Sequence, residues 1–276
     1  MSTDKHYKID VHHRKAIVKM QNTYNILAVG DTVGSSGVRH LTEKLWSIRK
    51  YYEIDLTIVN GENSADGNGM LPQSADDLIA AGADVVTGGN HSFRRREIYS
   101  YLDDSKVCIR PANMPSATPG FGYAIFEANG MRTLVINLLG NVYMDPLESP
   151  FVCADRILEE NKGKYDFAVV DIHAEATSEK AALARYLDGR VNIVFGTHTH
   201  VPTADMRTLP KGTGFVTDLG MVGVSESILG VDSKTIIEKF LTHMPTRFNQ
   251  AEGDVVADAV VFRLDKQSGK CVSVER

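Results

Sequence analysis

The sequence predicts an α/β fold with a mixed β-sheet core and helices on the outside. Two observations support this prediction. Short, continuously apolar runs rich in β-branched residues recur along the chain, each bounded by glycine, asparagine or aspartate, as is typical of buried strands. Segments with helical spacing of apolar residues separate the runs, and this alternation is typical of parallel strands connected by helices.

The expected strands and helices alternate through the first part of the chain. Strands are expected at residues 26–29, 56–59, 85–86, 167–170 and 191–195. Helices are expected around residues 38–48, 78–81, 98–102, 157–158 and 181–187. The first helix is the clearest, because Val38, Leu41, Leu45 and Ile48 form one apolar stripe.

The remaining strands are expected to form antiparallel hairpins. Residues 123–127 and 133–137 flank Asn129-Gly130, a pair typical of a type I′ turn. Residues 255–264 and 271–274 flank a polar turn and suggest a second, terminal hairpin. The sheet core is therefore expected to be mixed, and two sheets packed face to face with helices on both outer sides would also fit.

Composition and charge limit the classes of function. The chain has 276 residues, of which 43% are hydrophobic and 24% charged, and its net charge is -5. No basic stripe of the kind found in nucleic-acid-binding proteins is present, so RNA is not implied as a partner. Small anions bound through a metal remain compatible with this charge.

The chain is expected to be a cytoplasmic protein with one domain. Its three cysteines have no CxxC spacing, so a disulfide framework is not expected. No run reaches the roughly 18 apolar residues that a membrane span requires. No flexible linker or repeat divides the sequence, so a single domain is expected over residues 25–276.

Residues 1–24 are expected to be a polar N-terminal extension. Their longest apolar run, residues 16–18, is too short for the core of a signal peptide. His12 and His13 within it could contact a metal, but a solvated extension is the preferred interpretation.

Side chains able to bind a metal follow each of the five expected strands. They are Asp31, Glu62 with Asn63, Asn90 with His91, His173, and His198 with His200. Carboxyl ends of parallel strands gather along one sheet edge, where ligands bind. Each motif alone has an ordinary explanation: aspartate after a strand is commonly a cap or turn residue, and a single histidine is more often part of the core.

Taken together, these residues predict a two-metal site. Buried carboxylates need a compensating cation, and no lysine or arginine lies within these segments. Imidazole, carboxylate and amide ligands suit Mn or Fe, with Zn or Mg also compatible. Seven candidate ligands exceed one tetrahedral ion but match two ions sharing a carboxylate. Two ions roughly 3.5–4 Å apart clamp a phosphoryl group and activate a bridging hydroxide, so a phosphoesterase is predicted.

These motifs resemble the calcineurin-like metallophosphoesterase superfamily, and more closely the bacterial YmdB-like family of 2′,3′-cyclic-nucleotide phosphodiesterases. The resemblance covers about residue 25 to the C-terminus. It rests on the blocks at residues 29–34, 60–63, 89–91, 110–113, 173–180 and 196–201. The implied fold is a four-layer α/β/β/α sandwich.

The resemblance also implies a ligand assignment. Thr32-Val33 follows Asp31 where the wider superfamily has Asp-x-His, and Glu62 stands where its bridging acid is commonly aspartate. The YmdB-like family shares both departures, with Asn63 replacing the missing histidine. One ion would then be bound by Asp31, Glu62, Asn63 and His200, and the other by Glu62, Asn90, His173 and His198.

The implied activity is hydrolysis of small phosphodiesters, with His91 outside the ligand set. His91 would contact the phosphate and protonate the leaving oxygen. A phosphomonoesterase, or a metal-containing regulatory protein acting through partners, remains an alternative. The resemblance also implies a homo-oligomer, either a dimer or a tetramer.

Other motifs have weaker functional interpretations. Residues 30–37 imitate a nucleotide-binding loop, but they match neither GxGxxG nor a P-loop. Arg94, Arg95 and Arg96 are expected on a solvated helix face, although they could steer a phosphate diester. Arg110 is expected either at a substrate entrance or in a loop-locking role. Asp171 would either orient a metal ligand or cap a turn.

Overall fold

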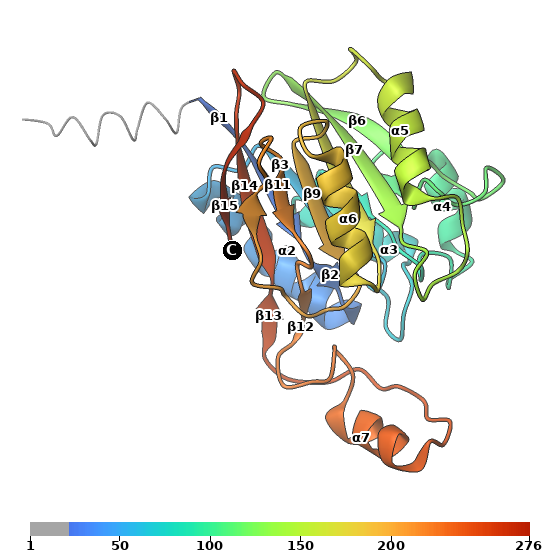
Figure 1. The fold of residues 1–276 in the computed structure, drawn as a ribbon. Coiled ribbons are helices and arrows are strands. Elements are labelled where there is room, and N and C mark those ends of the chain that lie inside the picture. The colour runs from blue at the N-terminus through green and yellow to red at the C-terminus, as the bar shows by residue number, and fades with distance from the viewer. Residues whose placement is uncertain (1–21) are drawn as a thin grey trace, which may run out of the picture.

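The computed structural model describes residues 22–276, and its strands build two six-stranded sheets that lie face to face (Figure 1). The first sheet has the order β15-β14-β1-β3-β4-β5. Strands β1, β3, β4 and β5 pair in parallel, and β14 joins β1 antiparallel. The strands are β1 (Thr23–Val29), β3 (Leu56–Asn60), β4 (Val85–Thr87), β5 (Cys108–Ile109), β14 (Ala259–Asp265) and β15 (Cys271–Glu275).

The second sheet has the order β10-β11-β9-β8-β7-β6. Its central strands β7, β8, β9 and β11 are parallel. The strands are β6 (Tyr123–Ala128), β7 (Met131–Leu139), β8 (Phe167–His173), β9 (Ile193–Thr197), β10 (Arg207–Thr208) and β11 (Gly214–Val216). A small sheet of β13 (Val255–Ala257), β12 (Met221–Val224) and β2 (Asp31–Thr32) adjoins them.

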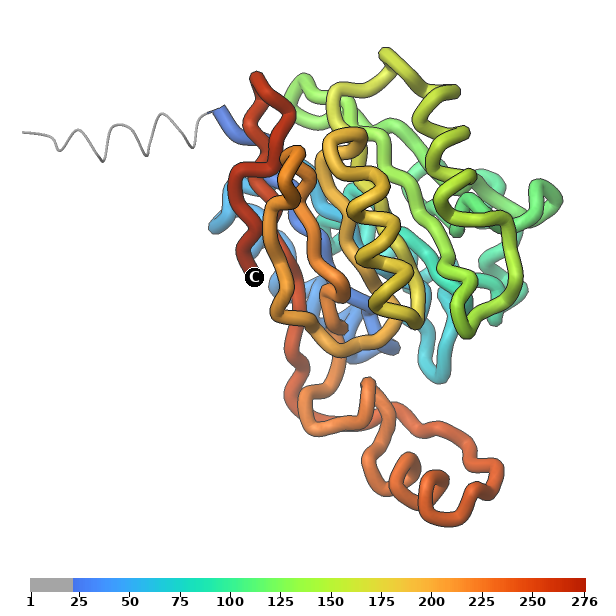
Figure 2. Tube along the Cα trace, in the orientation of Figure 1, coloured from blue at the N-terminus to red at the C-terminus, as the bar shows by residue number. Residues whose placement is uncertain are grey.

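Helices cover the outer face of each large sheet, which confirms the four-layer α/β/β/α sandwich. Apolar residues of α2 (Gly34–Tyr51), α3 (Pro72–Ala81) and α4 (Ile98–Asp104) pack on the first sheet. Those of α5 (Pro150–Glu160) and α6 (Thr177–Leu187) pack on the second. Helix α7 (Ser233–Thr242) lies outside the four layers, on an arm that projects from the body (Figure 1, Figure 2).

The strands are continuously apolar because both of their faces are buried. Between the sheets, Tyr24 of β1 stacks on Phe167 of β8, with ring centroids 5.2 Å apart. Phe195 and Phe262 extend this central layer. Each of the five strands expected from apolar runs is present, and so are the five expected helices.

Both expected hairpins are present, the second in a modified form. Asn129 and Gly130 have φ of 49° and 74°, as a type I′ turn requires. The expected strand at residues 255–264 is interrupted at Asp258, whose carbonyl accepts a hydrogen bond from Gly30. The interruption transfers the chain from β13 in the small sheet to β14 in the first sheet.

Two features depart from the sequence expectation. The domain begins before residue 25, because Thr23 and Tyr24 belong to β1 and Tyr24 is buried between the sheets. Helix α7 was not expected, and its apolar residues Phe240 and Leu241 are 71% and 79% exposed. The predicted role of His12 and His13 lies outside the described residues. None of the helices in residues 22–276 is long and apolar enough to cross a membrane.

Candidate metal centre

The eight predicted site residues gather where strands of both large sheets end. Three strands of the first sheet carry Asp31 after β1, Glu62 and Asn63 after β3, and Asn90 and His91 after β4. The second sheet contributes His173 at the end of β8, and His198 and His200 after β9. The predicted convergence of strand ends is therefore present, and it combines two sheets rather than one.

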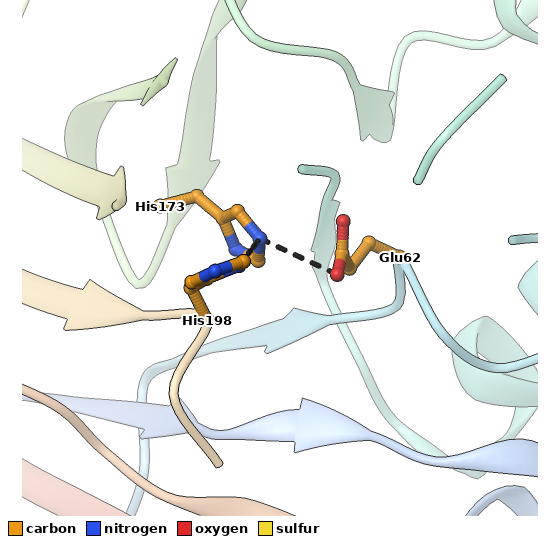
Figure 3. A group of neighbouring side chains, drawn as sticks. All are labelled: Glu62, His173 and His198. Carbon is orange, nitrogen blue, oxygen red and sulfur yellow. Dashed lines mark hydrogen bonds and ion pairs between the residues drawn. The ribbon is translucent and has the colours of Figure 1, made fainter. Parts of the chain in front are cut away.

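Glu62, His173 and His198 form the centre of the group (Figure 3). Their potential ligand atoms all lie within 4.8 Å of one another. Glu62 Oε1 lies 3.3 Å from His173 Nε2, and His198 Nδ1 lies 3.1 Å from the same nitrogen. Asn90 Oδ1 also contacts His173 Nε2, at 2.9 Å. These four residues are the set that the resemblance assigned to one ion.

Asp31, Asn63 and His200 form an adjoining group. Asp31 Oδ1 lies 3.7 Å from His200 Nε2. Asn63 Nδ2 lies 3.3 Å from His200 Nε2 and 2.7 Å from Glu62 Oε1. Glu62 thus contacts both groups. Asn63 faces the cluster with its amide nitrogen, so binding a metal through Oδ1 would require the amide to turn.

His91 contacts this network without facing His173 or His198. Its backbone nitrogen donates to Glu62 Oε2 at 2.8 Å, and its ring Nδ1 lies 3.0 Å from Asn63 Oδ1. His91 borders a cavity of about 240 Å³, which Asn63, His200 and Phe248 also line. The Nε2 side of the ring is therefore the part available to a bound molecule.

Burial and mutual charge perturb the titrating groups of the cluster. Burial raises the pKa of Asp31. Burial opposes protonation of His173, but the carboxylates of Glu62 and Asp31 outweigh it and raise the pKa of this ring to about 9. His198 has its pKa lowered to about 4, by burial and by His173. The buried carboxylates thus attract positive charge that the cluster's own imidazoles only partly supply.

The residues fit divalent cations. Asp31 is fully buried, and its Oδ1 has no hydrogen-bond partner, an arrangement that costs stability unless a cation compensates it. His173 Nδ1 contacts Thr197 Oγ1 and His200 Nδ1 contacts the Leu229 carbonyl. Both rings therefore direct Nε2 toward the carboxylates, as metal-bound histidines commonly do. The donor set of N and O atoms suits ions such as Mn, Fe and Zn.

Asp171 contacts the cluster indirectly, through Thr197. Its Oδ1 accepts a hydrogen bond from Thr197 Oγ1 at 2.7 Å, and its Oδ2 accepts one from Thr87 Oγ1 at 2.6 Å. Thr197 in turn contacts His173 Nδ1 at 2.9 Å. Asp171 was expected either to orient a metal ligand or to cap a turn. These contacts agree with the first expectation, with Thr197 lying between Asp171 and His173. Burial raises the pKa of Asp171 to about 6.

A buried ion pair behind the His198–His200 turn escaped the sequence analysis. Lys180 Nζ donates to Asp218 Oδ2 at 2.6 Å and to the Thr197 carbonyl at 2.7 Å. Asp218 also accepts from the Thr199 backbone at 3.1 Å. A signal existed, because Asp218 follows strand β11 just as Asp31 follows β1.

The arginines have different environments from those expected. Arg94, Arg95 and Arg96 lie in turns before α4, so the expected helix face is wrong. Arg95 donates to the backbone carbonyls of Asp66 and Asn68, while the other two are exposed. Arg110 donates to the carbonyls of its own loop, which agrees with the loop-locking expectation.

Comparison with known proteins identifies the family. The chain is 46% identical over 251 residues to a 2′,3′-cyclic-nucleotide 2′-phosphodiesterase of Bacillus subtilis (strain 168), covering 91% of this chain and 95% of that protein. The crystal structure of a novel phosphatase from Mycoplasma pneumoniae has a TM-score of 0.87, with 31% identity and 92% coverage of both chains. A hypothetical protein from Thermus thermophilus has a TM-score of 0.85, with 42% identity, covering 91% of this chain and 97% of that one. Residues 27–276 match the YmdB-like protein family, and the chain belongs to it.

Proposed function

We propose that the chain is a metal-dependent phosphodiesterase that hydrolyses small phosphodiesters such as 2′,3′-cyclic nucleotides. The observation that carries the proposal is the buried cluster of seven N- and O-donor side chains with one further imidazole, His91, at its open side. The name of the Bacillus subtilis relative supports the substrate class.

We assign the ligands as two sets that share Glu62. One set is Glu62, Asn90, His173 and His198, and the other is Glu62, Asp31, Asn63 and His200. Bound divalent ions, with Fe or Mn the best candidates, supply Lewis-acid polarisation of a phosphoryl group and acidify water. The position of Glu62, in contact with His173 and with Asn63, supports its role as the shared ligand.

His91 is proposed to protonate the leaving oxygen. Its ring Nδ1 faces the side-chain amide of Asn63, which would present its NH2 group to this nitrogen once Oδ1 turned to a metal, and its backbone nitrogen donates to Glu62 Oε2. These contacts fix the ring at the cavity edge while leaving Nε2 for the substrate. Proton donation from a positioned histidine is a common means of stabilising a departing alkoxide.

The surroundings favour a small substrate. The cavity beside His91 has a volume of about 240 Å³, small among ligand sites, and the protein is acidic overall. Phe248 and Leu229 add apolar surface to its lining. A compact diester is favoured over a long polyanion, which would need an extended basic groove.

The test compares a diester with a monoester on protein whose metal content is measured. Protein reconstituted with excess Mn should carry close to two ions per chain and open a 2′,3′-cyclic nucleotide to a nucleoside monophosphate. It should release little inorganic phosphate from that product.

Faster hydrolysis of the monoester would instead support a phosphomonoesterase. Absence of turnover on both substrates with two ions bound would support a regulatory role. One ion per chain at saturation would overturn the two-metal assignment.

A further inference from the structure

A second and larger cavity lies away from the metal centre. It has a volume of about 690 Å³ and lies between α5 and the loop that connects β5 to β6. None of the proposed metal ligands lines it, and neither does His91. A ligand in this cavity would therefore bind without contacting the proposed metal ligands or His91.

Arg110 is the unusual feature of this cavity. It is only 7% exposed, and it forms no ion pair with the carboxylates of residues 22–276. One Nη group donates to the Pro111 carbonyl at 2.7 Å and the other to the Thr118 carbonyl at 3.4 Å. Its Nε is buried without an acceptor. A buried guanidinium left in this condition is costly unless a counter-anion joins it.

Arg110 is the charged residue of the lining that lacks a partner of opposite charge among residues 22–276. Arg156 lies in the same lining, but it pairs with Glu148 at 3.1 Å and with Glu160 at 3.8 Å. The charge of Arg156 is therefore compensated, whereas that of Arg110 is not. Burial also lowers the pKa of Arg110, which reflects the same lack of compensating charge.

The rest of the lining is apolar and partly aromatic. Phe121 is 56% exposed, and it shares the lining with Tyr123, Met114 and Leu147. A flat ring can stack on such aromatic side chains. Carboxylate and phosphate groups both match the planar donor fork of arginine.

We propose that this cavity binds a small organic oxyanion, with its phosphate or carboxylate group on Arg110 and an attached planar ring against Phe121 and Tyr123. The apolar lining adds affinity for the ring and discriminates against inorganic anions.

Calorimetry with non-hydrolysable probes tests the proposal on the full-length, metal-loaded chain. Phenylphosphonate and benzoate both contain a phenyl ring, which is attached to a phosphonate group in one and to a carboxylate group in the other. Methylphosphonate lacks the ring. Phenylphosphonate or benzoate should bind the wild type, and Arg110→Met should weaken that binding roughly 10- to 100-fold. Arg132→Met is the matched control, because Arg132 pairs with Asp166 on the surface.

Two further variants separate this cavity from the metal centre and from misfolding. His200→Ala should leave the binding intact, whereas binding at the metal centre would be weakened in it, because the set of Asp31, Glu62 and Asn63 would lack its imidazole. Phe121→Ala should weaken the ring-bearing probe about tenfold and leave methylphosphonate unchanged, and this exposed residue can be removed without disturbing the core.

Two results would overturn the proposal. Loss of binding in His200→Ala with retention in Arg110→Met would assign the anion to the metal centre. No binding of either ring-bearing probe to the wild type at millimolar concentration would show that the cavity is not an oxyanion site.

Discussion

His91 and His200 both border the substrate-sized cavity, but their contacts differ. His200 directs Nε2 toward Asp31 Oδ1, at 3.7 Å, in a group that we assign to metal binding. His91 lies against Asn63 and Glu62, and its other ring nitrogen has no hydrogen bond or ion pair with residues 22–276. One histidine is therefore suited to ligation and the other to proton transfer.

Substituting His91 by alanine should separate these roles. We expect His91→Ala to retain both ions and to lose ~10²–10⁴-fold in kcat, with a smaller loss for a nitrophenolate leaving group that needs no proton. His200→Ala should lose metal and activity together. His40→Ala, on α2, is the control. Metal analysis beside steady-state kinetics gives the readout, and release of an ion from His91→Ala would make His91 a ligand.

At this scale, local sequence predicts which residues reach the site but not their partners. The rule that strand ends gather at one sheet edge was sufficient to collect Asp31, Glu62 and Asn90, but not to bring His173 to them, because β8 belongs to the second sheet. The Asp171–Thr197–His173 chain could not be predicted, because it depends on the register that places Thr197 opposite His173 across β8 and β9. Register between strands is not encoded in either strand alone.

At the scale of elements, the turn after β9 is held in an uncommon conformation. His198 and His200 have φ of 104° and 62°, values that non-glycine residues adopt only when the surroundings impose them. Lys180 of α6 and Asp218 after β11 impose it through Thr197 and Thr199. The uncommon backbone conformation of the turn is thus held by an ion pair, Lys180–Asp218, whose two side chains are buried.

Breaking that pair should affect both stability and metal retention. Lys180→Met leaves Asp218 buried and uncompensated, so we expect a loss of roughly 3–5 kcal/mol in the free energy of unfolding, together with weaker metal binding by His198 and His200. Arg190→Met removes an exposed pair with Asp155 of the same 2.6 Å length and should cost about 1 kcal/mol or less.

Urea unfolding with metal analysis of the native fractions measures both effects. Equal stability losses in the two variants would show that burial of the Lys180–Asp218 pair is not important. A large stability loss with unchanged metal content would show that the pair supports the fold without positioning the turn.

Helix α7 shows where element prediction fails. Its sequence carries helical signals, because Ile236, Ile237, Phe240 and Leu241 recur at helical spacing and Asp232 caps the N-terminus. The helix nevertheless lies on a projecting arm, and Ile237, Phe240 and Leu241 are exposed. The arm nevertheless reaches the site, because the Leu229 carbonyl contacts His200 and Phe248 lines the cavity. The helix was therefore recognisable from its cap and apolar spacing, whereas its position outside the sandwich was not.

At the scale of the whole molecule, the two sheets come from different parts of the chain. The first sheet uses residues 23–109 and 259–275, and the second uses residues 123–216. The alternation of strands and helices predicted an α/β class, but it could not assign strands to two sheets, since β4 and β8 look alike in sequence. The family resemblance supplied the four-layer arrangement that periodicity left open.

Because the ligands come from both sheets, bound metal should stabilise the whole molecule. Asp31, Glu62 and Asn90 belong to the first sheet, whereas His173 and His198 belong to the second, and unfolding separates them. A metal that binds only the native state adds ~2.7 kcal/mol at a hundredfold excess over Kd. For a domain of this size that corresponds to a Tm increase of roughly 5–10 °C.

Differential scanning calorimetry before and after chelation measures this increase. Removing both ions should lower the Tm of the wild type by about twice that amount, because each site contributes its own term, and readdition of Mn should restore it. His200→Ala should start from a lower Tm and respond less, since only the group around His173 remains complete. A wild-type Tm that is the same for chelated protein as for protein saturated with Mn would mean that the ions do not connect the two sheets. The assignment of ligands from β3 and β8 to one shared centre would then have to be abandoned.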